Sequence, residues 1–157
     1  MIVVSDTTAV TTLLKSGEER LLKQLFNEVF VPQAVWDELW AFHAQLPRFV
    51  SLRPVPQPTQ RLEGTETLGR GEAEAIKLAK ELNADLLLTD DRKARAAAAA
   101  LGVNSVGLLG LAIQARKCGH IQSVRAMIDA LETKGSLYLS DDVKAEALKL
   151  AGEDVAH

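Results

Sequence analysis

Two stretches of the sequence end in acidic residues directly after short apolar runs that are typical of buried β-strands. Asp6 follows residues 3–5, and Asp90 and Asp91 follow residues 86–89. Parallel strands present their carboxyl ends at one edge of a sheet, where open α/β proteins bind their ligands. Each Asp also has a structural interpretation, because an Asp before a helix caps its backbone N–H groups and complements its dipole.

The helix expected over residues 72–82 carries two glutamates with different surroundings. Glu72 lies three and four positions before Ala75 and Ile76 and continues the apolar stripe, so we expect it to point inward or along the rim. Glu74 falls on the polar face of the helix, and we expect it to be solvated. The alternative for Glu72 is that it only complements the helix dipole in the first turn.

Glu38 occupies a similar position in the helix expected over residues 32–44. Its helical neighbours Ala34, Val35 and Phe42 are all apolar. A lone carboxylate on an apolar stripe is costly unless it is paired or binds a cation. Glu38 therefore either pairs with an arginine or reaches solvent, or it belongs to a metal site.

The elements that must position these acids alternate along the chain. Short apolar runs predict strands over residues 1–5, 29–31, 49–52, 84–89 and 103–106. Helical spacing predicts helices over residues 7–15, 18–26, 32–44, 72–82, 92–101, 108–117, 121–133 and 141–151. Such alternation implies parallel strands joined by right-handed crossovers, and hence an α/β fold with a central parallel sheet flanked by helices on both faces. The helices at about 121–151 either close the core or form an oligomer face.

Acids at two strand ends and on two inward helix faces can converge at one edge of this sheet. The repulsion among several carboxylates is too large for a small domain unless a divalent cation lies among them. Oxygen ligands suit Mg²⁺ or Mn²⁺, which keep several waters and leave positions for a substrate phosphate. The chemistry that follows is metal-assisted hydrolysis of a phosphodiester bond.

The composition sets further limits. A chain of 157 residues has the size of one domain, residues 1–157. Its formal net charge of −3 excludes nucleic-acid binding by bulk positive charge, so any such binding uses a local basic patch or a metal. One cysteine and three histidines exclude an intramolecular disulfide and a zinc cluster of the Cys/His type. With no secretory leader and no long apolar run, we expect a cytoplasmic protein without a membrane segment.

Four stretches of the chain, taken in order, resemble the PIN-domain nucleases, in particular the compact bacterial and archaeal proteins of that family. They read VVSDTTAVTTLLK from Val3, VFVPQAVWDEL from Val29, GEAEAIKLAKELNADLLLTDDRKAR from Gly71 and LGVNSVGLLGLAIQARKCGHI from Leu101. The match covers nearly the whole chain, which makes it far more specific than any one motif. The resemblance implies a single PIN-like domain with an acidic metal site.

The resemblance assigns the metal ligands and catalytic acids residue by residue. Asp6 matches the Asp at the end of the first strand, Glu38 the Glu of the helix after the second strand, and Glu72 the acid that opens the middle helix. Two adjacent residues are candidates for the fourth acid of the family pattern. The common pattern of Thr, any residue, then Asp selects and favours Asp91, whereas Asp90 lies next to it at the strand end, so both are retained.

Other residues bear on substrate binding. Thr8 stands where the family often has a Ser or Asn that helps to position metal or phosphate; the alternative is a helix-start residue. Arg92, Lys93 and Arg95 directly follow the acidic pair and can contact RNA phosphates, or they form only a solvated helix start.

The function implied by the resemblance is that of a Mg²⁺- or Mn²⁺-dependent endoribonuclease, like the toxin of a toxin–antitoxin pair. RNA is then the substrate, and an antitoxin protein and a second copy of the chain are expected partners. The alternative is a catalytically silent PIN-like module that binds RNA or a protein. A haloacid-dehalogenase-type phosphatase is set aside because Thr8 stands where a second Asp is needed. Dinucleotide binding is set aside because no Gly-rich turn follows the first strand.

Overall fold

The computed structural model describes residues 1–153, so residues 154–157 of the predicted domain lie outside the described part. Its centre is a parallel sheet of five strands in the order β3-β2-β1-β4-β5. The predicted α/β class with a central parallel sheet is confirmed. The strands are short, and in chain order they are β1 (Val3–Ser5), β2 (Val29–Val31), β3 (Val50–Leu52), β4 (Leu86–Leu88) and β5 (Ser105–Val106).

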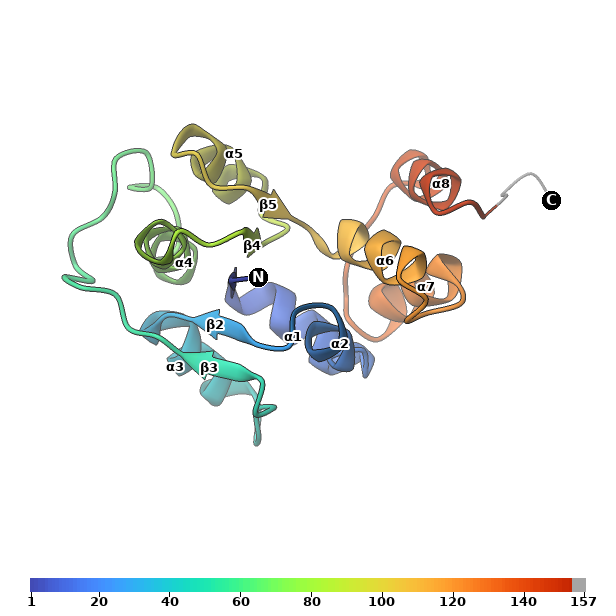
Figure 1. Ribbon diagram of the computed structural model, residues 1–157, viewed down its shortest axis with the longest axis horizontal. Helices are drawn as coiled ribbons and strands as arrows, with labels where there is room; N and C mark the ends of the chain where they lie inside the picture. Colours follow the sequence, from blue (N-terminus) through green and yellow to red (C-terminus); the bar gives the residue numbers. More distant parts are fainter. Residues whose placement is uncertain (154–157) are drawn as a thin grey trace.

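Helices cover both faces of the sheet (Figure 1). Successive residues of β1 point to opposite faces, so Val3 and Val4 are fully buried in two different apolar clusters. Helices α4 and α5 supply the cluster around Val4, and the remaining helices supply the cluster around Val3. The helices of the described chain are α1 (Thr7–Ser16), α2 (Arg20–Phe26), α3 (Gln33–Phe42), α4 (Arg70–Leu82), α5 (Arg92–Ala100), α6 (Leu108–Lys117), α7 (Val124–Thr133) and α8 (Asp141–Leu150).

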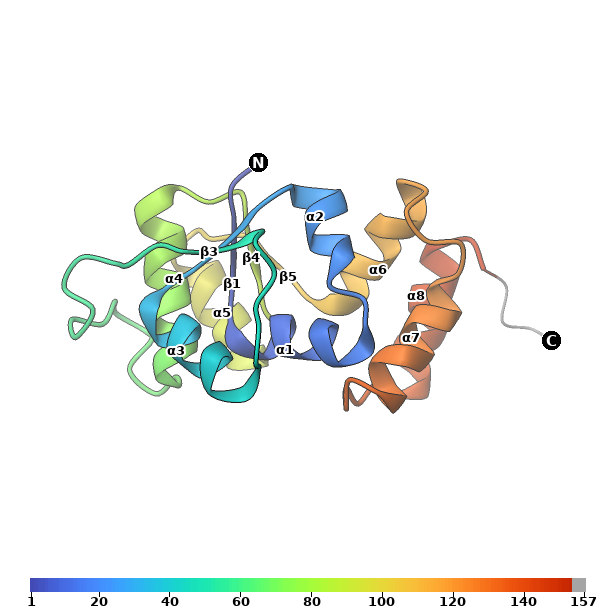
Figure 2. The same cartoon turned by 90° about the horizontal axis from the view of Figure 1, so that it is seen from below.

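The strand order reverses between β1 and β4. The chain proceeds from β1 outward through β2 and β3, and it then returns to the other side of β1 to form β4 and β5. The register pairs Ser5 with Leu88, and the N–H of Asp6 donates to the carbonyl of Leu88 at 3.1 Å. Figure 2 shows α3 and the first turns of α1, α4 and α5 at this carboxyl edge, the lower one in that view. The acids predicted at strand ends therefore meet where α/β folds bind ligands.

Several elements differ from their predicted bounds by a few residues. Helix α4 begins at Arg70, so Glu72 lies in its first turn rather than at its first position. Strand β4 is shorter than residues 84–89 because the N–H of Ala84 donates back to the carbonyl of Ala79 in α4 and not to a neighbouring strand. Asn83 ends the helix in the left-handed conformation, with φ 49°. The spacing of apolar residues does not show where such a cap ends a helix.

The C-terminal helices α7 and α8 pack against the rest of the chain through apolar side chains. Met127, Ile128 and Leu131 of α7 and Leu148 of α8 are buried in the same cluster as residues of α1 and α6. No helix in residues 1–153 is long and apolar enough to span a membrane.

Candidate active site

Asp6 is the most enclosed acid of the strand-end group, with 3% of its surface exposed. It is the N-cap of α1, and its Oδ1 accepts the N–H of Ala9 at 2.9 Å. Its Oδ2 accepts the hydroxyl of Thr89, from the end of β4, at 2.6 Å. The capping interpretation is therefore correct for Asp6. The same hydrogen bonds hold its carboxylate at the carboxyl edge of the sheet, where a ligand can still contact it.

Burial raises the pKa of Asp6 from 3.8 to about 6. The hydrogen bonds from Thr89 and Ala9 act in the opposite direction, and the negative charges of Glu72 and Asp90 raise the pKa further. The charges of two acids from other elements therefore act on Asp6. Clustered acids with a perturbed pKa at a ligand-binding edge are typical of functional sites.

Asp90 lies against the N-terminal end of α6. Both of its carboxylate oxygens accept the N–H of Leu108 at 3.2 Å, and α6 has no capping side chain at its own N-cap. Desolvation raises the pKa of Asp90, while the Leu108 hydrogen bond and the charge of Arg95 lower it. Gly107 leaves room for this arrangement, since a Cβ there would lie 2.3 Å from Oδ1 of Asp90.

Asp91 has a different environment from its neighbour. Its Oδ1 accepts the N–H of Ala94 at 2.9 Å, which makes it the N-cap of α5, whereas Asp90 accepts from α6; both residues are exposed. Asp90, and not Asp91, is among the charges that act on Asp6. Asp90 is therefore the one of the pair whose charge acts on Asp6, and the choice between Asp90 and Asp91 as the fourth acid stays a prediction.

Glu38 points from α3 towards the starts of α1 and α4. A Cβ at Gly71 would lie 2.9 Å from Oε1 of Glu38 and 3.3 Å from Oγ1 of Thr7, so both oxygens crowd the same side of α4. The Thr7 hydroxyl is buried without a hydrogen-bond partner among the described residues. A buried hydroxyl without a partner beside a carboxylate is suited to contact with an ion or a water.

Glu72 is half-buried in the first turn of α4. Its Oε2 lies back over the helix start, where a Cβ at Gly69 would approach it to 2.5 Å. This position complements the helix dipole, as the structural interpretation of Glu72 requires. The same charge acts on Asp6. Glu72 therefore complements the dipole of α4 and also adds its negative charge to the surroundings of Asp6.

The oxygen donors at this edge fit a hard divalent cation. They are carboxylates and a hydroxyl, which are the ligand types preferred by Mg²⁺ and Mn²⁺. In the described residues, however, no three acidic, histidine or cysteine side chains are close enough to hold one ion as they stand. Binding of an ion at this edge therefore requires rotamer changes, for which the half-buried Glu38 and Glu72 have more freedom than Asp6.

Glu74 is the one acid whose predicted environment is wrong. It is 3% exposed rather than solvated. Its Oε1 accepts the N–H of Ala34 at 3.0 Å, and its Oε2 pairs with Nε of Arg70 at 3.1 Å. The physical reason is that α3 starts after Pro32 without a capping side chain of its own and takes its cap from α4. The lack of Ser, Thr, Asp or Asn before α3 is the sequence signal that could have indicated a cap from elsewhere.

The predicted substrate contacts border the same edge. Thr8 is exposed in the first turn of α1, and Arg92, Lys93 and Arg95 are exposed in the first turn of α5. Arg95 also acts on Asp90 through its charge. These side chains are therefore accessible beside the carboxylates.

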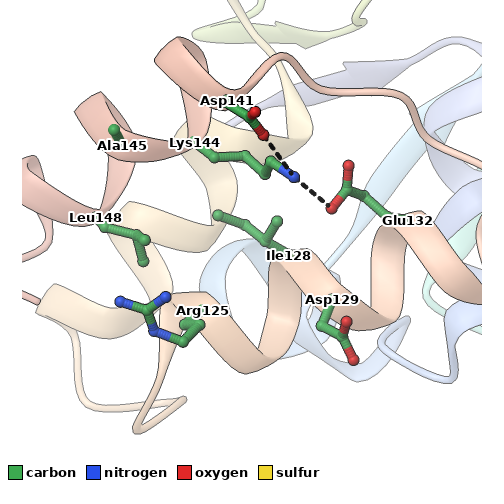
Figure 3. Close-up of a pocket in the computed structure, with 8 residues that line it drawn as sticks. All are labelled: Arg125, Ile128, Asp129, Glu132, Asp141, Lys144, Ala145 and Leu148. Carbon is green, nitrogen blue, oxygen red and sulfur yellow. Dashed lines mark hydrogen bonds and ion pairs between the residues drawn. The ribbon is translucent and has the colours of Figure 1, made fainter. Parts of the chain in front are cut away.

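A separate hollow lies between α7 and α8 and contains none of the predicted site residues (Figure 3). Lys144 crosses it to reach Glu132 at 3.2 Å and Asp141 at 3.6 Å. The pair with Glu132 joins α8 to α7, whereas the pair with Asp141 lies within α8. The hollow therefore has a structural explanation and is not the site that the strand ends form.

Comparisons with known proteins agree with this architecture. A family model described as a PIN domain matches residues 2–153. A solved structure of a PilT N-terminus domain protein from the hyperthermophilic archaeon Sulfolobus solfataricus P2 is similar, with a TM-score of 0.52 and 24% sequence identity. The similarity covers 71% of this chain and 90% of that one, and it shows the fold alone. No curated protein matches the sequence.

Proposed function

The chain belongs to the PIN-domain family, and on this premise we propose that it is a Mg²⁺- or Mn²⁺-dependent endoribonuclease. The observation that carries the proposal is that Asp6 and Asp90 follow the adjacent strands β1 and β4 at the point where the strand order reverses. The charge of Glu72 also acts on Asp6 there. PIN domains are generally nucleases, and their typical cofactor is a divalent metal ion, which agrees with the oxygen donors of this edge.

Each residue of the edge has a definite part in this proposal. Asp6, Glu38, Glu72 and Asp90 would hold the ion, and Asp91 is the alternative to Asp90. When bound, the ion would supply an activated water and stabilise the charge that develops on the leaving oxygen of the phosphodiester. Thr89 keeps one oxygen of Asp6 in place by its hydrogen bond.

The residues around the carboxylates would bind the substrate. Arg92 and Lys93 project from the start of α5 and would contact RNA phosphates, which position the strand without reading its sequence. Arg95, beside Asp90, would bind the phosphate closest to the acids. Thr8 would donate its hydroxyl to the same phosphate region from the start of α1.

The biological setting is proposed from the resemblance to compact toxin-like PIN proteins. The chain would act in the cytoplasm as the ribonuclease of a toxin–antitoxin pair, inhibited by an antitoxin protein and assembled as a homodimer. A neighbouring reading frame for a small DNA-binding protein would support this setting.

A catalytically silent PIN-like module is the second candidate. The observation in its favour is that no three candidate ligands in residues 1–153 are close enough to hold an ion as they stand. Such a module would bind RNA or a protein partner through the same edge without cleaving it.

One experiment separates the two candidates. The parent protein and Asp6→Asn are titrated with Mn²⁺ by calorimetry and then incubated with a mixed RNA substrate. Asp85→Asn is the matched control, since Asp85 accepts the N–H of Ile2 near the start of β1, at the opposite edge of the sheet. Binding and cleavage that are lost only in Asp6→Asn support the nuclease. RNA binding by the parent without Mn²⁺ binding or cleavage supports the silent module.

A further inference from the structure

Helix α3 depends on another helix for its N-terminal cap. It begins after Pro32, has no capping side chain and carries no acid in its first turn. The N–H groups of a first helical turn have no partner within the helix, and a carboxylate beside them also complements the helix dipole. Glu74 of α4 supplies that carboxylate from 40 residues along the chain, through its hydrogen bond with Ala34.

The cap is buried and its geometry is fixed from two sides. One oxygen of Glu74 accepts from Ala34 at 3.0 Å, and the other pairs with Nε of Arg70 one helical turn earlier on α4. Glu74 is 3% exposed, whereas the side chain of Arg70 is 69% exposed. The cap therefore depends mainly on the buried hydrogen bond to α3, because an ion pair with an exposed partner contributes little.

Both helices joined by this cap carry candidate ligands. Glu72 lies two residues before Glu74 on α4, and Glu38 lies one turn after Ala34 on α3. The helices also meet at Gly71, where only a missing Cβ allows Oε1 of Glu38 to come so near to the α4 backbone. A shift of α3 along α4 would therefore change the separation of the Glu38 and Glu72 carboxylates.

We infer that Glu74 is a positioning residue, which sets the place of Glu38 relative to Glu72 by capping α3 from α4. Glu74 does not itself contact the ion or the substrate. The consequence for metal binding rests on the proposed function, whereas the consequence for the position of α3 does not. Groups that orient metal ligands typically change metal affinity by about 10–100-fold when they are removed.

The chain offers a matched control at the other end of the molecule. Glu153 also caps a helix from outside it, since its carboxylate accepts the N–H of Val124 at 2.5 Å at the start of α7. It also has an arginine partner, Arg116, at 3.9 Å. Replacing Glu153 removes a capping carboxylate that comes from outside the helix, and α7 carries none of the candidate ligands. Unlike α3, α7 also has a capping side chain of its own, Ser123, which the replacement leaves in place.

The two tryptophans of the chain report on α3 directly. Trp36 and Trp40 both lie on this helix and contact one another edge to face, with ring centroids 5.9 Å apart. Intrinsic tryptophan emission therefore measures the environment of α3 without any metal or substrate. Thermal unfolding measures stability separately.

The test compares Glu74→Ala, Glu74→Gln and Glu153→Ala with the parent. Glu74→Ala is expected to shift the tryptophan emission of the folded protein and to weaken Mn²⁺ binding at least about tenfold. Glu74→Gln keeps an oxygen that accepts from Ala34, so its emission and Mn²⁺ affinity should remain close to those of the parent. Glu153→Ala should lower the unfolding temperature and leave both other readouts unchanged.

The outcomes separate the inference from the proposed function. If Glu74→Ala only lowers the unfolding temperature, as Glu153→Ala does, the positioning role is wrong. If Glu74→Ala does not fold, Glu74→Asp decides, because it keeps the charge but shortens the reach to Ala34, and an unchanged emission and affinity would contradict the inference. If the parent does not bind Mn²⁺, the metal proposal fails, and the emission of the variants still decides whether Glu74 positions α3.

Discussion

The Thr89 hydroxyl donates a hydrogen bond of 2.6 Å to Oδ2 of Asp6, and both residues are almost completely buried. Thr89 follows β4 and Asp6 follows β1, two strands that are neighbours in space but more than 80 positions apart in sequence. The bond thus joins the two strand ends between which the strand order reverses. It also favours the charged form of Asp6 in surroundings that otherwise disfavour it.

Replacing Thr89 with Val should raise the pKa of Asp6 above its present value of about 6. The substitution keeps the shape of the side chain but removes the hydroxyl that stabilises the carboxylate. An NMR titration of the Asp6 carboxyl would measure the change, and the pH at which RNA cleavage reaches half its maximum should move upward with it. Thr133→Val is the control, because its hydroxyl donates to a backbone carbonyl on the distant helix α7. An unchanged Asp6 titration in Thr89→Val would contradict the role assigned to this bond.

The stability of the metal-free protein should fall as the pH rises through the pKa of Asp6. This pKa is raised on folding, so the stabilising contribution is complete below 3.8 and is lost by the time the pH exceeds about 6. The rise from 3.8 to about 6 corresponds to about 3 kcal/mol. Asp6→Asn should remove this pH dependence and be more stable than the parent at pH 7. Asn can still accept the N–H of Ala9 and use its amide towards the Thr89 oxygen.

Urea unfolding of the parent and Asp6→Asn at pH 4, 5, 6 and 7 tests this expectation. Asp37→Asn is a suitable control, because Asp37 is exposed on α3 and bonds only to Gln33 in the described contacts. It should follow the pH dependence of the parent. A parent stability that is flat or rising between pH 4 and 6 would show that Asp6 is not the dominant titrating group.

The strand-end acids could be predicted from sequence because a strand followed by an Asp is a local pattern. The alternation of strands and helices then sufficed to place Asp6 near Asp90. The choice between Asp90 and Asp91 could not be made in this way. Asp90 accepts the N–H of Leu108, which lies 18 residues later, whereas Asp91 accepts the N–H of Ala94 in the next turn. The contact with Leu108 cannot be recognised from the local sequence.

The surroundings of Glu74 could not be predicted from the local sequence either. Helical periodicity places it with Lys77 and Glu81 on a polar face, and this pattern is normally solvated. The face is instead covered by the start of α3, whose unpaired N–H groups require a carboxylate. Periodicity distinguishes polar from apolar surroundings, but it does not distinguish water from a helix terminus.

Gly107→Ala should disturb Asp90 without changing any acid. A Cβ at this position would lie 2.3 Å from Oδ1 of Asp90 and 3.3 Å from a terminal nitrogen of Arg95. The carboxylate must therefore move away from the start of α6. We expect weaker Mn²⁺ binding by calorimetry and a similar loss in Asp90→Asn. Gly110→Ala is the control on the same helix, since its Cβ would also be crowded, at 2.8 Å from the side chain of Val106, but would approach no acid. Equal Mn²⁺ affinity in Gly107→Ala and the parent would mean that the Asp90 position does not matter for the ion.

Arg92 and Lys93 should contribute to RNA binding through phosphates rather than bases. Both are exposed at the start of α5, next to the carboxylates, in a chain whose formal net charge is −3. Loss of one phosphate contact should weaken binding of every sequence to a similar extent and reduce the slope of log affinity against log salt by about 0.7–1. Fluorescence anisotropy of labelled single-stranded RNAs, measured in the cleavage-deficient Asp6→Asn background at several salt concentrations, gives this slope for Arg92→Ala and Lys93→Ala. Lys149→Ala, an exposed cation of α8, should leave the slope unchanged. If Lys149→Ala lowers this salt slope as much as Arg92→Ala and Lys93→Ala do, RNA affinity depends on the overall charge of the chain. The proposed contacts beside the acids would then be wrong.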